Sequence, residues 1–137
     1  MDKEKVLLKL AEMEGYLKEL KGIIPKSVGE YRNEKKRACE RLLQISLESV
    51  FDVCNVLVSG LELGVPYSED DMFKKLKAAG MISEELYKKL RKMKACRNIL
   101  VHRYGLVDDR KIFSILKNNV SDFDLFKKEI VRHLNKA

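Results

Sequence analysis

Residues 38–57 read ACERLLQISLESVFDVCNVL and lie within the longest helix that the sequence predicts, from about residue 30 to residue 63. Apolar or small side chains recur there every three or four positions, which is the spacing of one face of an α-helix. The predicted face consists of Ala38, Leu42, Ile45, Ser49, Val53 and Leu57. Gly64 and Pro66 are predicted to end this helix.

Two further helical segments flank that stretch. The first is predicted over about residues 3–22, and a break follows it at Pro25 and Gly29. Its apolar positions are Val6, Leu7, Leu10, Met13, Leu17 and Leu20. The second is predicted from its N-cap Ser68 to about residue 79, with Gly80 as its stop. Its acidic residues 69–71 suit the positive end of the helix dipole.

The rest of the chain is also predicted to be helical. Ser83 is the predicted N-cap of a helix whose apolar positions include Leu86, Leu90 and Met93, and Gly105 interrupts it. The last helical region begins at residues 108–109 and is capped again at residue 121. Its apolar positions are Ile112, Phe113, Ile115, Leu116, Phe123, Phe126, Ile130 and Leu134. Together these segments predict one all-α domain over residues 1–137, a bundle of about five helices.

The composition narrows the classes of function. Lys and Arg number 28 against 21 Asp and Glu, and the net charge of +7 suits a nucleic-acid or anionic-membrane partner, or simply a lysine-rich surface. No apolar run approaches the length of a membrane span, and the first residues do not resemble a signal peptide. Three widely spaced cysteines, Cys39, Cys54 and Cys96, favour neither a disulfide framework nor a zinc site. A cytoplasmic location without a membrane is therefore expected.

One charged residue stands on the apolar face of the helix that follows Ser83. Arg97 comes four positions after Met93 and three before Leu100, so it lies near the centre of that apolar stripe. An unpaired guanidinium is unfavourable there, which predicts a cleft or a carboxylate partner nearby. Arg97 is therefore either half of a structural ion pair or a functional arginine that contacts phosphate oxygens.

The residues after Arg97 are suited to act with it. His102 comes four positions after Asn98, which places both on one helix face, and Tyr104 follows two positions later. Histidine is the usual acid or base near neutral pH. His133 has no such neighbours in the sequence. The alternative interpretation is an ordinary surface histidine and a packing tyrosine.

Basic residues surround this segment. They are Lys88, Lys89, Arg91, Lys92, Lys94 and Arg103. They are predicted to hold the phosphate backbone of a nucleic acid, although a solvated lysine face is the simpler alternative. The chain has no phosphate-binding loop, zinc motif or paired-cysteine ligand set, so we expect neither a metal site nor a cofactor.

The long helix carries a polar stripe of its own. It consists of Gln44, Glu48, Asp52 and Asn55. These side chains fall within about 80° of one another on a helix of 3.6 residues per turn. A carboxylate there could pair with Arg97 or orient His102, with Asp52 as the first candidate and Glu48 as the second. A solvent-exposed face or a dimer seam is the alternative.

The pattern of Arg97, His102 and Tyr104, R-x-x-x-x-H-x-Y, closely resembles the signature of HEPN-domain proteins of the HepT type. Residues 41–48, together with Asp52, resemble the second helix of that family, and the helix after Ser83 resembles its fourth. The resemblance covers about residues 30–117, and no motif position departs from the family pattern.

The resemblance implies a fold, an activity and a partner. HEPN proteins are antiparallel bundles of four to five helices that form two-fold dimers, and many are metal-independent endoribonucleases. The HepT type is typically the toxin of a toxin–antitoxin pair. Its antitoxin is a minimal nucleotidyltransferase of the MntA type, which adenylylates the motif tyrosine, and larger assemblies of the two are also expected. Arg97 and His102 would then be catalytic, Asn98 would shape the site and Tyr104 would carry AMP.

Metal-free cleavage of RNA predicts attack by the 2′-hydroxyl of the substrate. His102 would serve as base or acid, and Arg97 would stabilise the charge on the phosphorus oxygens. A two-fold dimer would supply a histidine on each side of the phosphorus. The alternative function is a non-catalytic helical module that binds a nucleotide or a nucleotidyltransferase. A third is a purely structural helical dimer.

Overall fold

The computed structural model describes residues 1–102 and 108–136, apart from the side chains of residues 33 and 34. Within these ranges all regular structure is helical, which confirms the predicted all-α fold class. The elements are α1 (Lys3–Ile23), α2 (Val28–Glu30), the π-helical turn η1 (Tyr31–Lys35), α3 (Lys36–Gly60), α4 (Glu69–Ala78), α5 (Glu84–His102), α6 (Asp109–Asn118) and α7 (Asp122–Lys136).

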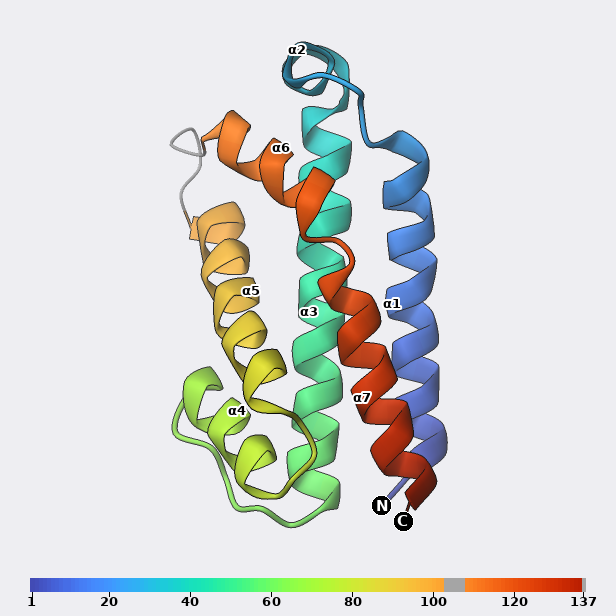
Figure 1. Ribbon diagram of the computed structural model, residues 1–137, viewed down its shortest axis with the longest axis vertical. Coiled ribbons are helices and arrows are strands. Elements are labelled where there is room, and N and C mark those ends of the chain that lie inside the picture. The colour runs from blue at the N-terminus through green and yellow to red at the C-terminus, as the bar shows by residue number, and fades with distance from the viewer. Residues whose placement is uncertain (103–107, 137) are drawn as a thin grey trace.

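The helices form an up-and-down bundle around α3 (Figure 1). α1 and α5 lie on either side of α3 and run antiparallel to it, and the short α4 packs against α3 and α5 at one end. The two chain termini lie together at that end, and α6 lies at the other (Figure 1). An ion pair between Lys127 and Glu14 joins α7 to α1.

The buried stripe of α1 is narrower than the sequence predicts. Val6, Leu10, Met13, Leu17 and Leu20 are buried, at the spacing expected for one helix face. Leu7 was predicted to join them, but its side chain is 50% exposed. The prediction for Leu7 is wrong because α1 packs mainly on α3, so residues about 100° away from the stripe face solvent.

α3 differs from its prediction in extent and in the width of its buried surface. The predicted helix over residues 30–63 is divided into α2, η1 and an α-helix that ends at Gly60. Ala38 is exposed, and Leu42 and Ile45 are only half-buried. The predicted Ser49, Val53 and Leu57 are buried, and so are Cys39, Leu43, Ser46, Leu47, Val50, Phe51, Cys54 and Val58. A central helix covered on several sides buries more than one stripe.

By length and composition alone, α3 is apolar enough to cross a membrane. However, 56% of its most apolar 18-residue window is buried inside the bundle, where it contacts α1, α4 and α5. α3 is therefore the core helix of the fold, which accounts for its hydropathy.

N-cap side chains position α4, α5 and α6, and those of α4 and α5 are the ones that the sequence predicts. The hydroxyl of Ser68 accepts a hydrogen bond from the Asp71 N–H at 3.1 Å, and that of Ser83 accepts one from the Leu86 N–H at 3.1 Å. Asp108 caps α6 in the same way. The last predicted helical region is two helices, because α6 ends at Asn118 and α7 begins at Asp122.

Candidate active site

The side chain of Arg97 is largely enclosed, as its place in the apolar stripe of α5 predicts. It is 17% exposed and forms an ion pair with Glu69, in the first turn of α4. Its Nε donates a hydrogen bond to Oδ1 of Asn98 at 2.9 Å. Its guanidinium lies 4.8 Å from the centroid of the Phe51 ring of α3, within the range of a cation–π contact. Groups from three helices therefore fix the guanidinium.

The carboxylate partner of Arg97 is Glu69, which no sequence pattern indicates. The sequence predicts only that Glu69 suits the dipole of α4, and it makes Asp52 and then Glu48 the candidate partners. In the structure Asp52 is exposed, and Glu48 accepts a hydrogen bond from Nε2 of Gln44 at 3.0 Å. That pairing was wrong because α4 folds back onto α5, a contact that no local pattern reveals. A role for Asp52 toward His102 stays a prediction.

His102 is exposed at the C-terminal end of α5. It shares a helix face with Asn98, as predicted, and this face continues backward at steps of three and four residues. We call this surface the exposed face of α5; it consists of the exposed Lys88, Arg91, Ala95 and His102 and the half-buried Asn98. Because Arg97 and His102 are five residues apart, their side chains leave the helix about 140° from one another. Within one chain they therefore point toward different surfaces.

The basic residues before the motif fall into two groups. Lys89 is paired with Asp122 at 2.6 Å, and this hydrogen bond raises the pKa of Lys89. Lys94 is paired with Asp70 of α4 at 3.3 Å. The remaining three, Lys88, Arg91 and Lys92, are exposed, and the Arg91 guanidinium lies 5.9 Å from the Tyr87 ring.

An open hollow of about 540 Å³ adjoins the exposed face of α5. It is lined by Asp70, Lys88, Arg91, Lys92, Lys94, Ala95 and Asn98. Because Asp70 neutralises Lys94 there, the free positive charge comes from Lys88, Arg91 and Lys92. Such a surface is suited to a phosphate backbone and leads along α5 toward His102.

Arg103, Tyr104 and Gly105 lie outside the described residues, so the predictions for them remain predictions. α5 ends at His102 immediately before them, and α6 begins after the N-cap Asp108. The start of α6 is held by Asp109, whose Oδ1 lies 2.9 Å from Lys36 Nζ and whose Oδ2 lies 3.6 Å from Arg32 Nε.

The three cysteines are free and buried. Desolvation raises the pKa of each thiol, and that of Cys96 reaches about 11 although Lys111 acts in the opposite direction. Over residues 1–102 and 108–136, no group of three or more His, Cys, Asp and Glu side chains is placed to hold a metal ion.

Sequence comparisons relate the chain to known ribonucleases. The family model described as ribonuclease HepT-like matches residues 13–130. The tRNA nuclease HepT of Aphanizomenon flos-aquae is 27% identical over 121 residues, which are 87% of this chain and 82% of that protein. The mRNA nuclease HepT of Shewanella oneidensis is 31% identical over 84 residues, which are 61% of this chain and 63% of that protein.

Solved structures share the fold. The tri-AMPylated HEPN toxin of Shewanella oneidensis, in complex with an MNT antitoxin, superposes with a TM-score of 0.85 at 23% identity, covering 96% of this chain and 99% of that one. The cytosolic protein YutE of Bacillus subtilis gives a TM-score of 0.82 at 23% identity, covering 99% and 92%. Because the family model spans most of the chain, including the segment that carries Arg97 and His102, the chain belongs to the ribonuclease HepT-like family.

Proposed function

We propose that the protein is an endoribonuclease, the toxin of a toxin–antitoxin pair, and that it cuts RNA without a metal ion. The observation that carries the proposal is the arrangement on α5. Arg97 is fixed by Glu69, Asn98 and Phe51, while His102 is exposed at the end of a basic face of α5. This arrangement offers a held cation for phosphate oxygens, an accessible imidazole for proton transfer and a surface for the RNA backbone.

The proposed reaction is transesterification within the RNA. The 2′-oxygen attacks the adjacent phosphorus, its proton passes to a neutral imidazole of His102, and the bond from phosphorus to the 5′-oxygen breaks. A protonated imidazole gives its proton to the leaving 5′-oxygen. The products are a 2′,3′-cyclic phosphate and a 5′-hydroxyl, and no electrons are exchanged. Arg97 stabilises the negative charge that accumulates on the non-bridging oxygens.

The reaction favours a two-fold dimer as the active form. One imidazole does not reach both sides of the phosphorus, and Arg97 and His102 of one chain diverge by about 140° around α5. A second chain facing the first supplies the missing groups. We therefore propose that one site at the two-fold axis combines the imidazoles of His102 from both protomers with Arg97.

Cleavage of labelled RNA in EDTA tests the catalytic assignment. His102→Ala and Arg97→Ala are each expected to lower kcat by about 10²–10⁴-fold. His133→Ala is the matched control, because that ring bonds the backbone oxygen of Glu129 at 2.8 Å, far along the chain in α7. DNA of the same sequence should resist, since it lacks the 2′-hydroxyl. Full activity in either motif variant, or a strict need for a divalent cation, would refute the assignment.

Mixing active and inactive chains tests the shared site. Wild-type chains and chains with His102→Ala are unfolded together, refolded and assayed. If one site uses the imidazoles of both protomers, a mixed dimer lacks one of the two and should be nearly inactive. A mixed dimer that keeps about half of the wild-type activity would show that each chain acts alone and would contradict the shared site.

The proposed regulator is a nucleotidyltransferase that transfers AMP to Tyr104. The phenol oxygen would attack the α-phosphorus of ATP, pyrophosphate would leave, and the phenol proton would pass to solvent. A phosphodiester two residues from His102 would place negative charge beside a phosphate-binding site and repel RNA. Incubation with the antitoxin and ATP, followed by mass spectrometry, should locate AMP on Tyr104. Tyr67→Phe is the control, since Tyr67 is 96% exposed, and modification that survives Tyr104→Phe would contradict the proposal.

The alternative function is a non-catalytic module that binds a nucleotide or a nucleotidyltransferase. Expression separates the two. A toxin should arrest growth, and His102→Ala should relieve the arrest, whereas a binding module should leave growth unchanged with either chain.

The three buried thiols suit a reducing compartment, and we propose that the protein acts in the cytoplasm.

A further inference from the structure

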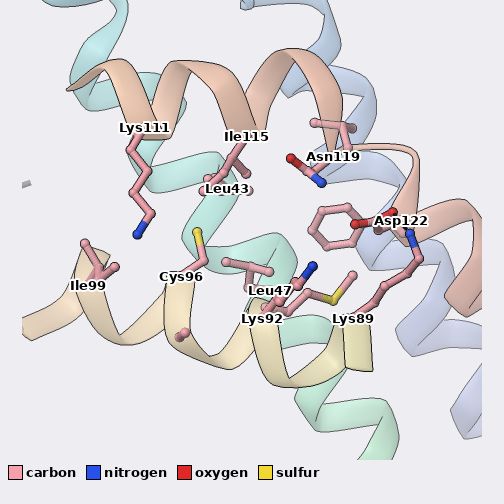
Figure 2. A pocket seen from close by; sticks show the side chains of 14 residues that line it. Leu43, Leu47, Lys89, Lys92, Cys96, Ile99, Lys111, Ile115, Asn119 and Asp122 are labelled. Carbon is pink, nitrogen blue, oxygen red and sulfur yellow. Dashed lines mark hydrogen bonds and ion pairs between the residues drawn. The ribbon is translucent and has the colours of Figure 1, made fainter. Parts of the chain in front are cut away.

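A second hollow opens between α5 and α6, with α3 as its floor (Figure 2). Its volume is about 330 Å³, near the lower end of small-molecule sites. Its walls are mostly apolar, from Leu43, Leu47, Met93, Cys96, Ile99, Ile115, Val120 and Phe123. The thiol of Cys96 and the amide of Asn119 point into the space between the two helices (Figure 2).

The rim of this pocket is cationic. Lys92 comes from α5 and Lys111 from α6, both exposed and without an ion-pair partner among the described residues. Lys89 also lies at the rim, but Asp122 neutralises it. An apolar interior with two free ammonium groups at the mouth is complementary to a flat apolar group attached to an anion.

The pocket adjoins the basic hollow on the exposed face of α5. Lys92 and Ala95 line both. The exposed ridge of α5 that they form therefore separates a surface for phosphates from a pocket of limited size. A strand whose backbone lies along the exposed face can turn one nucleotide over this ridge, with its phosphate beside Lys92.

We propose that the pocket between α5 and α6 receives one unstacked nucleobase of a single-stranded RNA substrate. This inference rests on the proposed function. Recognition of RNA commonly uses bases splayed out of the stack and inserted against apolar or aromatic side chains. The Phe123 ring and the Met93 side chain supply those surfaces, and the amide of Asn119 is placed to donate or accept a hydrogen bond at the base edge.

Binding of short labelled single-stranded RNAs, one for each base, tests the pocket separately from catalysis. Wild type should prefer one base by about fivefold or more, because an edge hydrogen bond discriminates by at least that factor. Asn119→Ala should remove the preference. Asn118→Ala is the matched control, since its exposed amide donates to Ser114 at 3.2 Å and does not line the pocket. A wild type without base preference, or a preference that persists in Asn119→Ala, overturns the proposal.

Two more variants test occupancy and charge. Ile115→Trp fills the pocket from α6 and should weaken RNA binding at least about fivefold, the lower value for one stacked base. Lys111→Ala should lower the slope of binding against salt by about one, and Lys117→Ala, on the same helix outside the pocket, should not. Because Lys111 is exposed, Lys111→Ala should fold, and it still tests the proposal if Ile115→Trp does not fold. Unchanged binding in Lys111→Ala overturns the proposal.

Other occupants give different results. If Ile115→Trp converts a dimer to a monomer in sedimentation, the pocket is filled by a second copy of the chain. If decanoate displaces RNA and uridine monophosphate does not, the pocket binds an acyl carboxylate. Both overturn the proposal. Failure of the proposed function is distinguishable: RNA would bind with an Asn119-dependent preference but remain uncut. If the pocket proposal fails, RNA is still cleaved, and the base preference at the cleavage site is the same in Asn119→Ala as in wild type.

Discussion

The carboxylate of Glu129, on α7, holds the residue at which α5 begins. It is 5% exposed and accepts hydrogen bonds from the Ser83 N–H at 2.7 Å and from the Ser83 hydroxyl at 2.6 Å. The same hydroxyl oxygen accepts the Leu86 N–H, so the carboxylate also orients the N-cap of α5. Replacing Glu129 by Ala therefore leaves two donors of Ser83 without their partner.

The expected loss follows from those two bonds. A hydrogen bond to a charged group contributes about 1.5–3 kcal/mol, and the lower value suits a site where water can enter the space left by the side chain. Glu129→Ala should therefore lower the free energy of unfolding by about 3 kcal/mol. In a domain of this size that corresponds to a fall in Tm of about 10 °C. Glu129→Gln keeps one acceptor and should lose about half as much.

Urea denaturation followed by circular dichroism measures these losses. Glu19→Ala, at an exposed position of α1, is the control and should change stability by less than about 0.5 kcal/mol. The double variant with Ser83→Ala should lose less than the sum of the single losses, by about 1 kcal/mol or more, because both residues belong to one network. Additive losses, or a Glu129→Ala variant as stable as the control, would refute the reasoning.

Three further perturbations separate structural charges from functional ones. Glu69→Gln should lower kcat of RNA cleavage about 10- to 100-fold with little change in KM, because the Arg97 guanidinium loses its fixed position; a faster enzyme would show that Glu69 instead restrains Arg97. Lys92→Ala should lower the salt slope of RNA binding by about one, whereas Lys94→Ala, already paired with Asp70, should leave it nearly unchanged. The folded-state pKa of Cys96, about 11, lies above its ordinary value of 9.0, so its contribution to stability is complete below pH 9 and lost as the pH rises through 11. Urea denaturation across that range should show a decline in stability with pH that is less steep in Cys96→Ala, by up to about 1.4 kcal/mol per pH unit.

Local patterns predicted the helices because the signals for helices are local. Ser68 and Ser83 cap the helices that they are predicted to cap, since a capping side chain acts within three residues of itself. The buried surface of α3 was harder to predict. Which residues of a central helix face the core depends on how many neighbours cover it, and the periodicity of one helix carries no information about those neighbours.

In the candidate site, too, local patterns indicate some residues, and only the packing of helices reveals others. Arg97 stood out because a charge interrupts an apolar stripe, and His102 because its chemistry suits proton transfer. Glu69 carried no comparable signal, since an acidic residue in the first turn of a helix is already accounted for by the dipole. Its second role arises only from the packing of α4 on α5, which brings together residues 28 positions apart.

The charged contacts of α5 explain how a basic helix can serve both structure and binding. Glu129 fixes its first turn, and Lys89 and Lys94 are paired with acidic residues of neighbouring segments. Glu69 holds Arg97 near its other end. These pairs lie on the sides of α5 that face the bundle and leave Lys88, Arg91, Asn98 and His102 on the exposed face. Because rigid contacts hold the helix from one side, the groups on the other side keep fixed spacings, and fixed spacings are what a repeating phosphate backbone requires.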